Sequence, residues 1–529
     1  MNKLLVANRG EIAVRVIRTC RDMGIATVAV YSQCDRNALH VRLADEAYAI
    51  GPDQASESYL RIDRLIDVAR RSRAEGVHPG YGFLAENPEF AEACDQAGVT
   101  FVGPGAKAMR AMGSKTAARG IAVAAGVPVV PGGDDPAAIG FPLLVKAVAG
   151  GGGKGMRAVR APGDLASAVQ LARSEALSAF GDDRVYFERL LEQPRHIEVQ
   201  LLGDRHGTVV PFVERECSIQ RRHQKLIEET PSPSVTPALR DRLMTAAAAI
   251  GRAAGYTSAG TIEFLVDAAG EFYFLEMNTR LQVEHPITEA VTGLDFVRAQ
   301  IEIARGARIS ARADLKVGTT AGDRSDVVLA FRPADGDKFI NGHAIEVRVY
   351  AENPYEGFLP SPGLITRLRA PSGVGVRDDS GAYEGWTVPT AYDPLVSKVI
   401  TWAPDRPGAI RRMVRALTEY DLRGISTTIG FCRDLVASPA FAAAEFDTTY
   451  VDRLLAQDGG NRRGEALEET AAIAAALWEI RKAGRGAGLK ASSTSVASST
   501  YVEPTFRSAN SAKHTDSLWA QRARVESLR

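Results

Sequence analysis

The sequence predicts an α/β protein that begins with a mostly parallel, doubly wound sheet. Three observations support this: an apolar strand opens the chain, Ile12, Val16 and Ile17 then recur at helical spacing, and strands and helices continue to alternate. The expected elements are a strand at 3–7, a helix at 10–23, a strand at 27–31, helices near 59–71 and 88–97, and a strand at 100–102. No G-x-G-x-x-G follows the first strand, so a dinucleotide site is not indicated.

Length and composition predict a protein of several domains. A chain of 529 residues suggests three or four domains. Lys plus Arg and Asp plus Glu both number 64, so no global field would recruit nucleic acid or an anionic membrane. The early charges and the lack of a membrane-length apolar run predict a cytoplasmic protein. The cysteines lie far apart, which predicts buried reduced thiols: Cys20, Cys34, Cys94, Cys217 and Cys432.

A glycine-rich loop follows an apolar strand in the next part of the chain. The strand at 141–146 ends in Lys146, and four glycines occupy 150–153. Consecutive glycines let backbone amides surround an anion. The loop is not a P-loop, because Gly155 and Val148 stand at positions that the motif reserves for Ser or Thr and for Gly. A hinge or tight hairpin is the alternative, but the strand that ends in Lys146 favours a nucleotide site.

Three polar segments follow. Strand-like runs at 185–191 and 196–202 place Glu188 where it could accept from an adenine amino group, or where it is an ordinary surface residue. The charged run 214–229 is either a solvated face or, beside a phosphate, a source of donors. Its candidate donors are Gln220, His223 and Lys225. Cys217 in this run is expected to be structural.

The most informative segment is 276–286, where polar side chains occupy every second position. They are Glu276, Asn278, Arg280, Gln282 and Glu284. In an extended backbone this spacing gathers carboxylates, amides and a guanidinium along one edge. The alternative is an amphipathic strand whose polar side is merely solvated.

A hairpin is expected just before that segment, from strands at 261–267 and 271–276. If Asp267 pairs with Phe272, Glu263 faces Glu276. Like charges directly opposite destabilise a ladder unless a cation lies between them, and hard divalent ions bind carboxylate oxygens. We therefore expect Mg²⁺ at Glu263, Glu276 and Asn278.

The rest of the chain alternates ordered and irregular stretches. A helix is expected at 287–304, loss of periodicity at 306–342, a strand at 342–352 with Glu346 and Arg348 on one face, β-rich stretches around 359–363, 374–377 and 392–398, and a helix at 408–419. Past Leu455 we expect a linker at 456–464, an Ala-rich helix at 466–482, a disordered stretch at 484–513 and a last helix at 516–528. That last helix either docks a partner or folds back.

Several of these stretches together resemble biotin carboxylase, a member of the ATP-grasp superfamily. The matching stretches are A7-N-R-G-E-I-A13, H78-P-G-Y-G-F-L84, M112-G-S-K115, G150-G-G-G-K-G-M156, Q220-R-R-H-Q-K225, E276-M-N-T-R280, Gln282-Val283-Glu284-His285-Pro286 and L359-P-S-P-G363. The resemblance implies an N-terminal doubly wound, Rossmann-like domain, a small glycine-rich lid and a C-terminal α+β domain. The corresponding boundaries are 1–117, 118–190 and 191–455, with 456–529 as a tail.

The resemblance also implies roles for individual residues. ATP would be held by Lys115, Lys146, Gly152, Gly153, Met156, Glu188, Gln220 and His223. Mg²⁺ or Mn²⁺ would be held by Glu263, Glu276 and Asn278, in agreement with the hairpin argument. Arg280, Gln282 and the Val283 amide would bind bicarbonate, and Glu284 would be its general base. Arg348 would stabilise the biotin enolate, and Lys225 would help to orient the anions.

The implied chemistry is attack of bicarbonate on the γ-phosphate of ATP, which gives carboxyphosphate, followed by carboxylation of biotin. Since no A-M-K-M biotinyl-lysine sequence occurs, the biotin is expected on a separate biotin carboxyl carrier protein. The other expected partners are a second copy of the chain and a carboxyltransferase subunit, and the final acceptor would be acetyl-CoA, another acyl-CoA or pyruvate. Two alternatives stay open: another ATP-grasp carboxylate–amine ligase, and an inactive nucleotide-binding scaffold.

Overall fold

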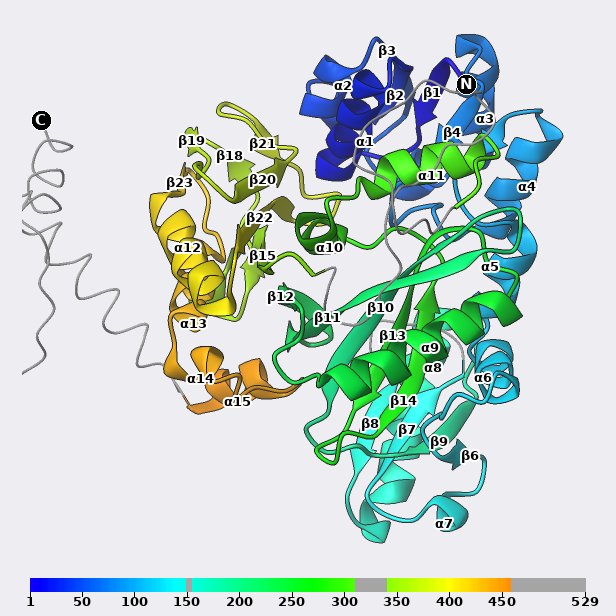
Figure 1. The fold of residues 1–529 in the computed structure, drawn as a ribbon, viewed down its shortest axis with the longest axis vertical. Helices are drawn as coiled ribbons and strands as arrows, with labels where there is room; N and C mark the ends of the chain where they lie inside the picture. Colours follow the sequence, from blue (N-terminus) through cyan, green and yellow to red (C-terminus); the bar gives the residue numbers. More distant parts are fainter. Residues whose placement is uncertain (149–154, 310–339, 458–529) are drawn as a thin grey trace, which may run out of the picture. The chain divides into compact units, whose positions relative to one another are not determined.

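The computed structural model describes residues 1–148, 155–309 and 340–457. Its N-terminal part is a five-stranded parallel sheet in the order β3-β2-β1-β4-β5 (Figure 1). The strands are β1 (Lys3–Val6), β2 (Ala26–Ser32), β3 (Glu46–Gly51), β4 (Gly76–His78) and β5 (Thr100–Phe101). The helices are α1 (Gly10–Asp22), α2 (Leu39–Leu43), α3 (Ile62–Ser72) and α4 (Pro88–Gln96), with short 3₁₀ turns at Gln33–Asp35 and Ala55–Glu57. The predicted parallel, doubly wound sheet is confirmed.

A smaller four-stranded antiparallel sheet follows, in the order β6-β9-β7-β8. Helices α5 (Ala106–Gly113) and α6 (Lys115–Ala124) lead to it. Its strands are β6 (Gly132–Gly133), β7 (Leu143–Ala147), β8 (Met156–Val159) and β9 (Val185–Arg189), and its helices are α7 (Pro136–Ile139) and α8 (Leu165–Phe180), the latter after a 3₁₀ turn at Pro162–Asp164. Leu143, Val145, Val159 and Ala172 form its own small apolar core against α8.

The largest sheet has eight antiparallel strands in the order β14-β13-β10-β11-β12-β15-β22-β20. The strands are β10 (Arg195–Gly203), β11 (Val209–Arg221), β12 (Gln224–Thr230), β13 (Ser258–Val266), β14 (Phe272–Asn278), β15 (His343–Tyr350), β20 (Val376–Ser380) and β22 (Leu395–Ala403). Helix α9 (Pro237–Ala253) packs against β10 and β11, and α10 (His285–Thr292) packs against β12, β15 and β22. Helix α11 (Phe296–Ala304) packs against both β13 and α1. This packing joins the N-terminal sheet to the large sheet.

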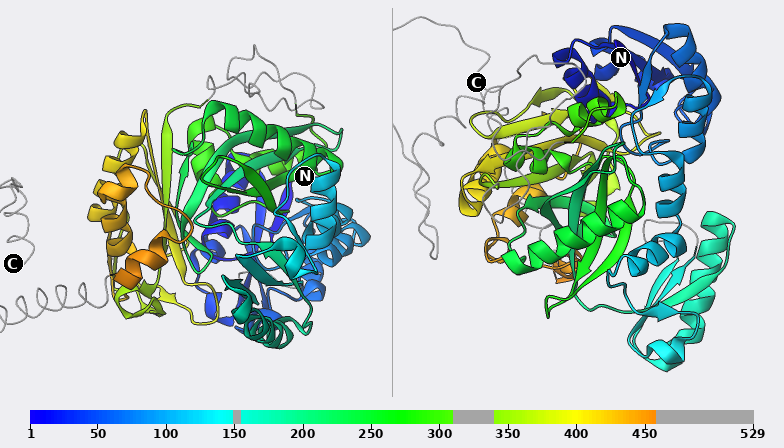
Figure 2. Two further views of the ribbon diagram at one scale, coloured as in Figure 1. Left: turned by 90° about the horizontal axis from the view of Figure 1, so that it is seen from below. Right: turned by 45° about the vertical axis from the view of Figure 1, so that its right-hand side comes forward.

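The C-terminal part covers the β15–β22 half of that sheet. Helix α12 (Arg406–Glu419) lies along β22, as Figure 2 shows from two further sides, and α13 (Ile429–Val436) packs against α12. Helices α14 (Pro439–Ala442) and α15 (Tyr450–Gln457) follow. Three two-stranded ladders complete this part: β16 (Glu352–Asn353) with β17 (Leu359–Pro360), β18 (Gly363–Leu364) with β21 (Thr387–Val388), and β19 (Arg367–Arg369) with β23 (Asp421–Arg423); a 3₁₀ turn lies at Pro354–Glu356.

The predicted hairpin is present, but its register differs from the predicted one. Val266, and not Asp267, pairs with Phe272. A register shift between Glu263 and Phe264 then restores the pairing of Glu263 with Glu276. A bulge places one extra residue on one strand, so the two carboxylates face each other although the turn is set differently.

Two predicted elements are interrupted. The extended segment was predicted to continue to Glu284, but β14 ends at Asn278, and 279–284 form a bend and a turn. The single helix predicted at 287–304 is two helices, because Gly293 takes a φ of 74° and ends α10.

Of the two interpretations of the run 214–229, the solvated face is wrong for most of its residues: the run is largely a buried hairpin of β11 and β12, with Arg222 and His223 exposed at its turn. Two predictions need correction. Cys34 is exposed, whereas the other four cysteines are buried as predicted. Ala456 and Gln457, predicted as linker, are the end of α15.

Some predictions lie outside the described residues: the glycine run 150–153, most of the irregular stretch 306–342, and the tail from 458. Among the described helices, none is both long and apolar enough to cross a membrane.

Candidate active site

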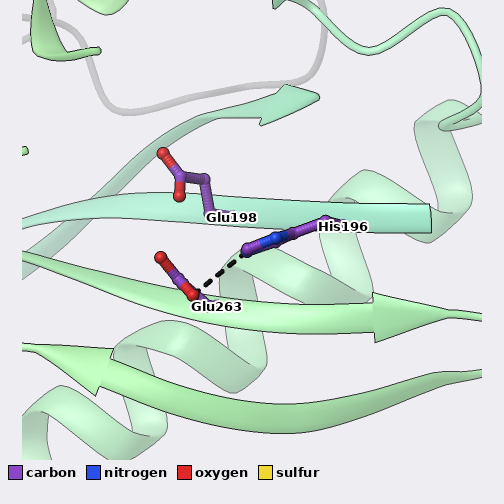
Figure 3. Close-up of side chains that lie close together, drawn as sticks. All are labelled: His196, Glu198 and Glu263. Carbon is purple, nitrogen blue, oxygen red and sulfur yellow. Dashed lines mark ion pairs between the residues drawn. The ribbon is translucent and has the colours of Figure 1, made fainter. Parts of the chain in front are cut away.

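A row of charged side chains crosses four neighbouring strands of the large sheet. Glu276 on β14 faces Glu263 on β13, which faces Glu198 on β10, which in turn faces Arg215 on β11. Side chains directly opposite each other lie on the same face of a sheet. Figure 3 shows His196 and Glu198 on one strand and Glu263 on the next, with the ring of His196 directed at Glu263. His196 Nε2 lies 3.1 Å from Glu263 Oε2.

Lys225 on β12 neutralises this row of carboxylates. Its Nζ donates to Glu198 Oε2 at 2.6 Å, to Glu263 Oε1 at 2.9 Å and to Glu284 Oε1 at 2.7 Å. Burial would lower the pKa of Lys225, but the three carboxylates outweigh it and raise that pKa well above its ordinary value. The ammonium therefore stays charged and holds together carboxylates from β10, β13 and the turn after β14.

Arg215 supports Glu198 from the opposite side. Its side chain is fully buried. Its Nε donates to Glu198 Oε1 at 2.5 Å, and its two other nitrogens donate to Gln200 Oε1 at 2.8 Å, Thr288 Oγ1 at 3.0 Å and Thr261 Oγ1 at 3.2 Å. Each donor group therefore has an acceptor, which is what a buried guanidinium requires.

Glu284 lies between two cations. It is fully buried, and besides Lys225 it accepts from Arg348 Nη2, which lies 2.9 Å from its Oε2. Arg348 Nε donates to Glu228 Oε1 at 2.6 Å. Burial would raise the pKa of Glu284, but Lys225, Arg348 and Arg215 outweigh it and hold that pKa well below its ordinary value. Glu284 is therefore a carboxylate, able to accept a proton.

Arg280 gathers the polar side chains that follow β14. Its Nη2 donates to Asn278 Oδ1 at 3.0 Å, and its Nη1 donates to Gln282 Oε1 at 2.9 Å. Its Nε donates to Glu86 Oε2 at 2.8 Å, and Glu86 Oε1 also accepts from the Thr279 backbone N–H at 2.8 Å. The bend after Asn278 thus brings together the same side chains that a continuous strand would have aligned.

Glu263, Glu276 and Asn278 offer oxygen donors that fit Mg²⁺. The surrounding protein and the charge of Glu263 raise the pKa of Glu276, so the pair repels and a cation would relieve it. Asn278 donates through Nδ2 to Glu263 Oε1 at 2.9 Å, which leaves its amide oxygen directed toward Arg280. Donor atoms of His196, Glu198 and Glu263 also lie within 4.8 Å of one another, but Lys225 already bridges these two glutamates.

The expected nucleotide residues fall into three places. Lys146 on β7 donates to Glu188 Oε2 on β9 at 2.8 Å, and Met156 on β8 lies opposite Lys146. Lys115 begins α6, where burial and the charge of Lys146 lower its pKa. Gln220 and His223 lie in the β11–β12 hairpin; Gln220 is buried, and His223 lies exposed in the turn. Gly152 and Gly153 lie outside the described residues.

Sequence reasoning missed His196, Glu198, Arg215, Glu228 and Glu86, which hold the expected site residues in place. A signal for the first two was present: His196, Glu198 and Gln200 occupy every second position of a strand, as Glu276 and Asn278 do. Glu86 lies just past the matching stretch 78–84 and carries no comparable pattern.

Family models match three consecutive parts of the chain. They are described as the N-terminal domain of biotin carboxylase, at residues 1–109, the ATP-binding domain of the carbamoyl-phosphate synthase L chain, at 110–312, and the C-terminal domain of biotin carboxylase, at 346–453. A pyruvate carboxylase subunit of Methanothermobacter thermautotrophicus is 50% identical over 462 residues, which are 85% of this chain and 89% of the relative. Biotin carboxylase 1 of Bacillus subtilis is 46% identical over 85% of this chain and 98% of its own length.

The chain belongs to the biotin carboxylase family.

Solved structures of biotin carboxylases share the fold. A Campylobacter jejuni biotin carboxylase, solved as a β,γ-ATP complex, superposes with a TM-score of 0.77 at 42% identity and covers 85% of this chain and 98% of that one. The biotin carboxylase domain dimer of Hydrogenobacter thermophilus 2-oxoglutarate carboxylase, solved with MgADP, ADP and bicarbonate, gives 0.78 at 42% identity over 85% and 97%. The predicted ATP-grasp fold and the enzyme class, an ATP-dependent biotin carboxylase, are confirmed.

Proposed function

We propose that the residues around Glu284 carry out bicarbonate-dependent carboxylation of biotin through carboxyphosphate. The observation that supports this most is the position of Glu284, buried between Lys225 and Arg348 and two residues from Gln282, which contacts Arg280. This arrangement places a carboxylate base beside cations that can bind an anion and stabilise developing negative charge.

Arg280, Gln282 and the Val283 amide would hold bicarbonate, and Glu284 would take its proton. A carboxylate that contacts two cations is a weak base. Proton transfer from bicarbonate to Glu284 is therefore favoured only when the bound bicarbonate also interacts with those cations. Once Glu284 is protonated its attraction for Lys225 and Arg348 falls. Those two cations then become available to the carboxyphosphate and to the biotin enolate, which links proton removal to the stabilisation of the next anion.

Lys115, Lys146, Gln220 and His223 would contact the phosphates, with Glu188 and Met156 toward the adenine and Gly152 and Gly153 in the covering loop. In this structure Lys146 donates to Glu188, so the phosphates of ATP would compete with Glu188 for the ammonium of Lys146. Glu263, Glu276 and Asn278 would hold Mg²⁺ or Mn²⁺, which when bound neutralises phosphate charge. Phosphoryl transfer depends mainly on positioning and charge neutralisation, and this site supplies both without a nucleophilic side chain.

Biotin would arrive on a separate carrier protein, and the assembly would be completed by a second copy of this chain and a carboxyltransferase subunit. Relatives at 44–50% identity are named for pyruvate, methylcrotonoyl-CoA and propionyl-CoA. Since these acceptors differ while the matched region is shared, we assign acceptor choice to the carboxyltransferase. Location in the cytoplasm and the domain boundaries near 117, 190 and 455 stay predictions from the sequence.

Another ATP-grasp ligase would share Lys115, Lys146, Glu263 and Glu276. Such a ligase does not require Glu284 beside Arg348. An inactive scaffold does not require a carboxylate at position 284 whose pKa is lowered by two cations. The retained geometry favours the carboxylase.

The test is ADP release by the purified chain with ATP, Mg²⁺ and bicarbonate, with and without free biotin or a biotinylated carrier. We expect biotin-stimulated turnover that requires bicarbonate. Glu284→Gln, which keeps the shape and removes the base, should lower it by about 10²–10⁴-fold. Turnover that ignores both biotin carrier and bicarbonate would contradict the proposal and favour the ligase or scaffold.

A further inference from the structure

Lys398 is a buried cation to which the proposed reaction assigns no role. It lies on β22, its side chain is fully buried, and in the sheet it faces Arg348 on one side and Asp379 on the other. Its Nζ donates to the backbone carbonyl of Val283 at 2.8 Å and lies 3.2 Å from Glu11 Oε1 on α1. Glu11 belongs to the A7-N-R-G-E stretch, which also has no assigned role.

His285 makes a matching contact one peptide group earlier. Its side chain is fully buried, and its Nδ1 lies 2.7 Å from the Gln282 carbonyl oxygen. Because a carbonyl oxygen can only accept, Nδ1 must carry the proton. Burial and the nearby cations of Lys398, Arg15 and Arg377 lower the pKa of His285 well below its ordinary value, so the ring is neutral.

These two contacts fix two successive peptide groups. The Gln282 carbonyl belongs to the planar group that also carries the Val283 N–H, and the Val283 carbonyl belongs to the group that carries the Glu284 N–H. Holding both carbonyl oxygens therefore sets the direction of the Val283 N–H and the point from which the Glu284 side chain starts. Neither peptide lies in a strand, so no sheet ladder orients them.

We propose that Lys398 and His285 are positioning residues that clamp the turn 282–284, with Glu11 holding the ammonium of Lys398 toward that turn. The inference rests on the proposed function, which gives Val283 and Glu284 their contacts with bicarbonate. It adds a specific expectation: loosening the turn should impair the use of bicarbonate and leave ATP binding intact, because the proposed ATP residues lie on other elements.

Two sets of variants test the clamp. His285→Leu removes the donor without changing charge, and His285→Asn keeps an N–H donor near the position of Nδ1. Lys398→Met combined with Glu11→Gln removes the cation together with the carboxylate that forms an ion pair with it, while Asp379 keeps its ion pair with Arg377. Val436→Ala, a buried change on α13 away from the turn, is the control for a general loss of stability.

We expect His285→Leu and the double variant to lower kcat/KM for bicarbonate by about 10–100-fold, because displacements near 1 Å at a reacting group have effects of this size. KM for ATP should stay within about twofold, and His285→Asn should recover most of the loss. Folded variants that keep kcat/KM for bicarbonate within about twofold would overturn the clamp, as would a change of much more than twofold in KM for ATP. Val436→Ala shows how far a general loss of stability alone lowers turnover.

These measurements separate the clamp from the function on which it rests. A wild-type chain without bicarbonate-dependent turnover would overturn both. A wild-type chain with such turnover and insensitive variants would overturn the clamp alone. Thermal unfolding of each variant shows whether it is folded, and if the double variant does not fold, His285→Leu and His285→Asn decide the question.

Discussion

At the scale of single residues, four carboxylates show how their neighbours set a pKa: Glu263, Glu284 and Glu346 are buried, and Asp378 is half-buried. Glu263 and Glu284 contact cations, and those cations hold their pKa values below the ordinary range although burial opposes this. Glu346 and Asp378 have oxygens without a hydrogen-bond partner among the described residues, and burial raises their pKa values. Glu263 and Glu284 therefore stay charged, whereas Glu346 and Asp378 are protonated more readily.

Asp378 on β20 gives a pH-dependent prediction. Burial raises its pKa from 3.8 to about 7, with Asp379 adding to the shift and Ser397 opposing it. The folded state therefore binds more protons than the unfolded state between these two values. Its contribution to stability is fully present below the unfolded pKa and is lost as the pH rises through the folded one.

Asp378→Asn removes that loss, since an amide does not ionise. Relative to wild type, we expect the variant to gain roughly 1–3 kcal/mol of unfolding free energy between pH 5 and pH 8. Urea denaturation at the two pH values measures the gain. Asp134→Asn, at an exposed position, controls for the change in formal charge, and an equal gain in both variants would contradict the argument.

At the scale of elements, periodicity located most strands and helices but not all of their ends. The helix predicted at 287–304 shows why: its apolar positions continue in phase through Gly293, and only the positive φ of that glycine divides α10 from α11. The end of the strand that contains Glu276 was mispredicted for a similar reason. Polar and apolar residues continue to alternate after Asn278, although the backbone bends there.

Two glycines test this account of the break. A Cβ at Gly293 would meet no atom within 4 Å, so Gly293→Ala is penalised only by the left-handed backbone, by roughly 1–2 kcal/mol. A Cβ at Gly120, in the exposed face of α6, also meets nothing, and its backbone is helical. Gly120→Ala should therefore stabilise by roughly 0.5–1 kcal/mol.

Urea denaturation of the two variants measures both changes in unfolding free energy: a decrease for Gly293→Ala and an increase for Gly120→Ala. Equal effects would show that conformation at residue 293 is not what divides the helices.

The β11–β12 hairpin marks the limit of local reasoning. Charged residues from Glu214 to Glu229 resemble a solvated surface because their partners are far away in sequence. Lys225 is held by Glu198 and Glu284, and Arg215 is held by Glu198 and Thr288. Nothing within the run shows that these charges are neutralised, so burial could not be predicted from it.

At the scale of the molecule, the site was predictable to the extent that it is local. The pairing of Glu263 with Glu276 was expected from one hairpin, although a bulge and not the expected register produces it. The roles proposed for Glu284 and Arg348 come from the resemblance. The contacts that hold the site together join strands separated by long stretches of chain, such as Glu228 with Arg348. Such contacts depend on the order of strands in the sheet, which no single segment specifies.

All the segments that the family models match, and all the proposed site residues, lie before Gln457, where the described part of the chain ends. We therefore expect a chain that stops after Gln457 to keep its turnover with free biotin within about twofold. ADP release and thermal unfolding of the shortened and full chains measure this. A large loss of turnover without a loss of thermal stability would instead assign part of the catalysis to residues 458–529.

The row Glu276–Glu263–Glu198–Arg215 has a consequence for how the chain can change in length. A single insertion in β10 or β13 would turn the residues beyond it to the opposite face of the sheet, since successive side chains alternate. One such event would separate Glu198 from Arg215 and Lys225 and place unpaired charges in the apolar layer under α9. Catalysis and folding would then fail together, so we expect an insertion in these strands to be tolerated less well than one in a turn or loop, unless a bulge absorbs it as at Glu263.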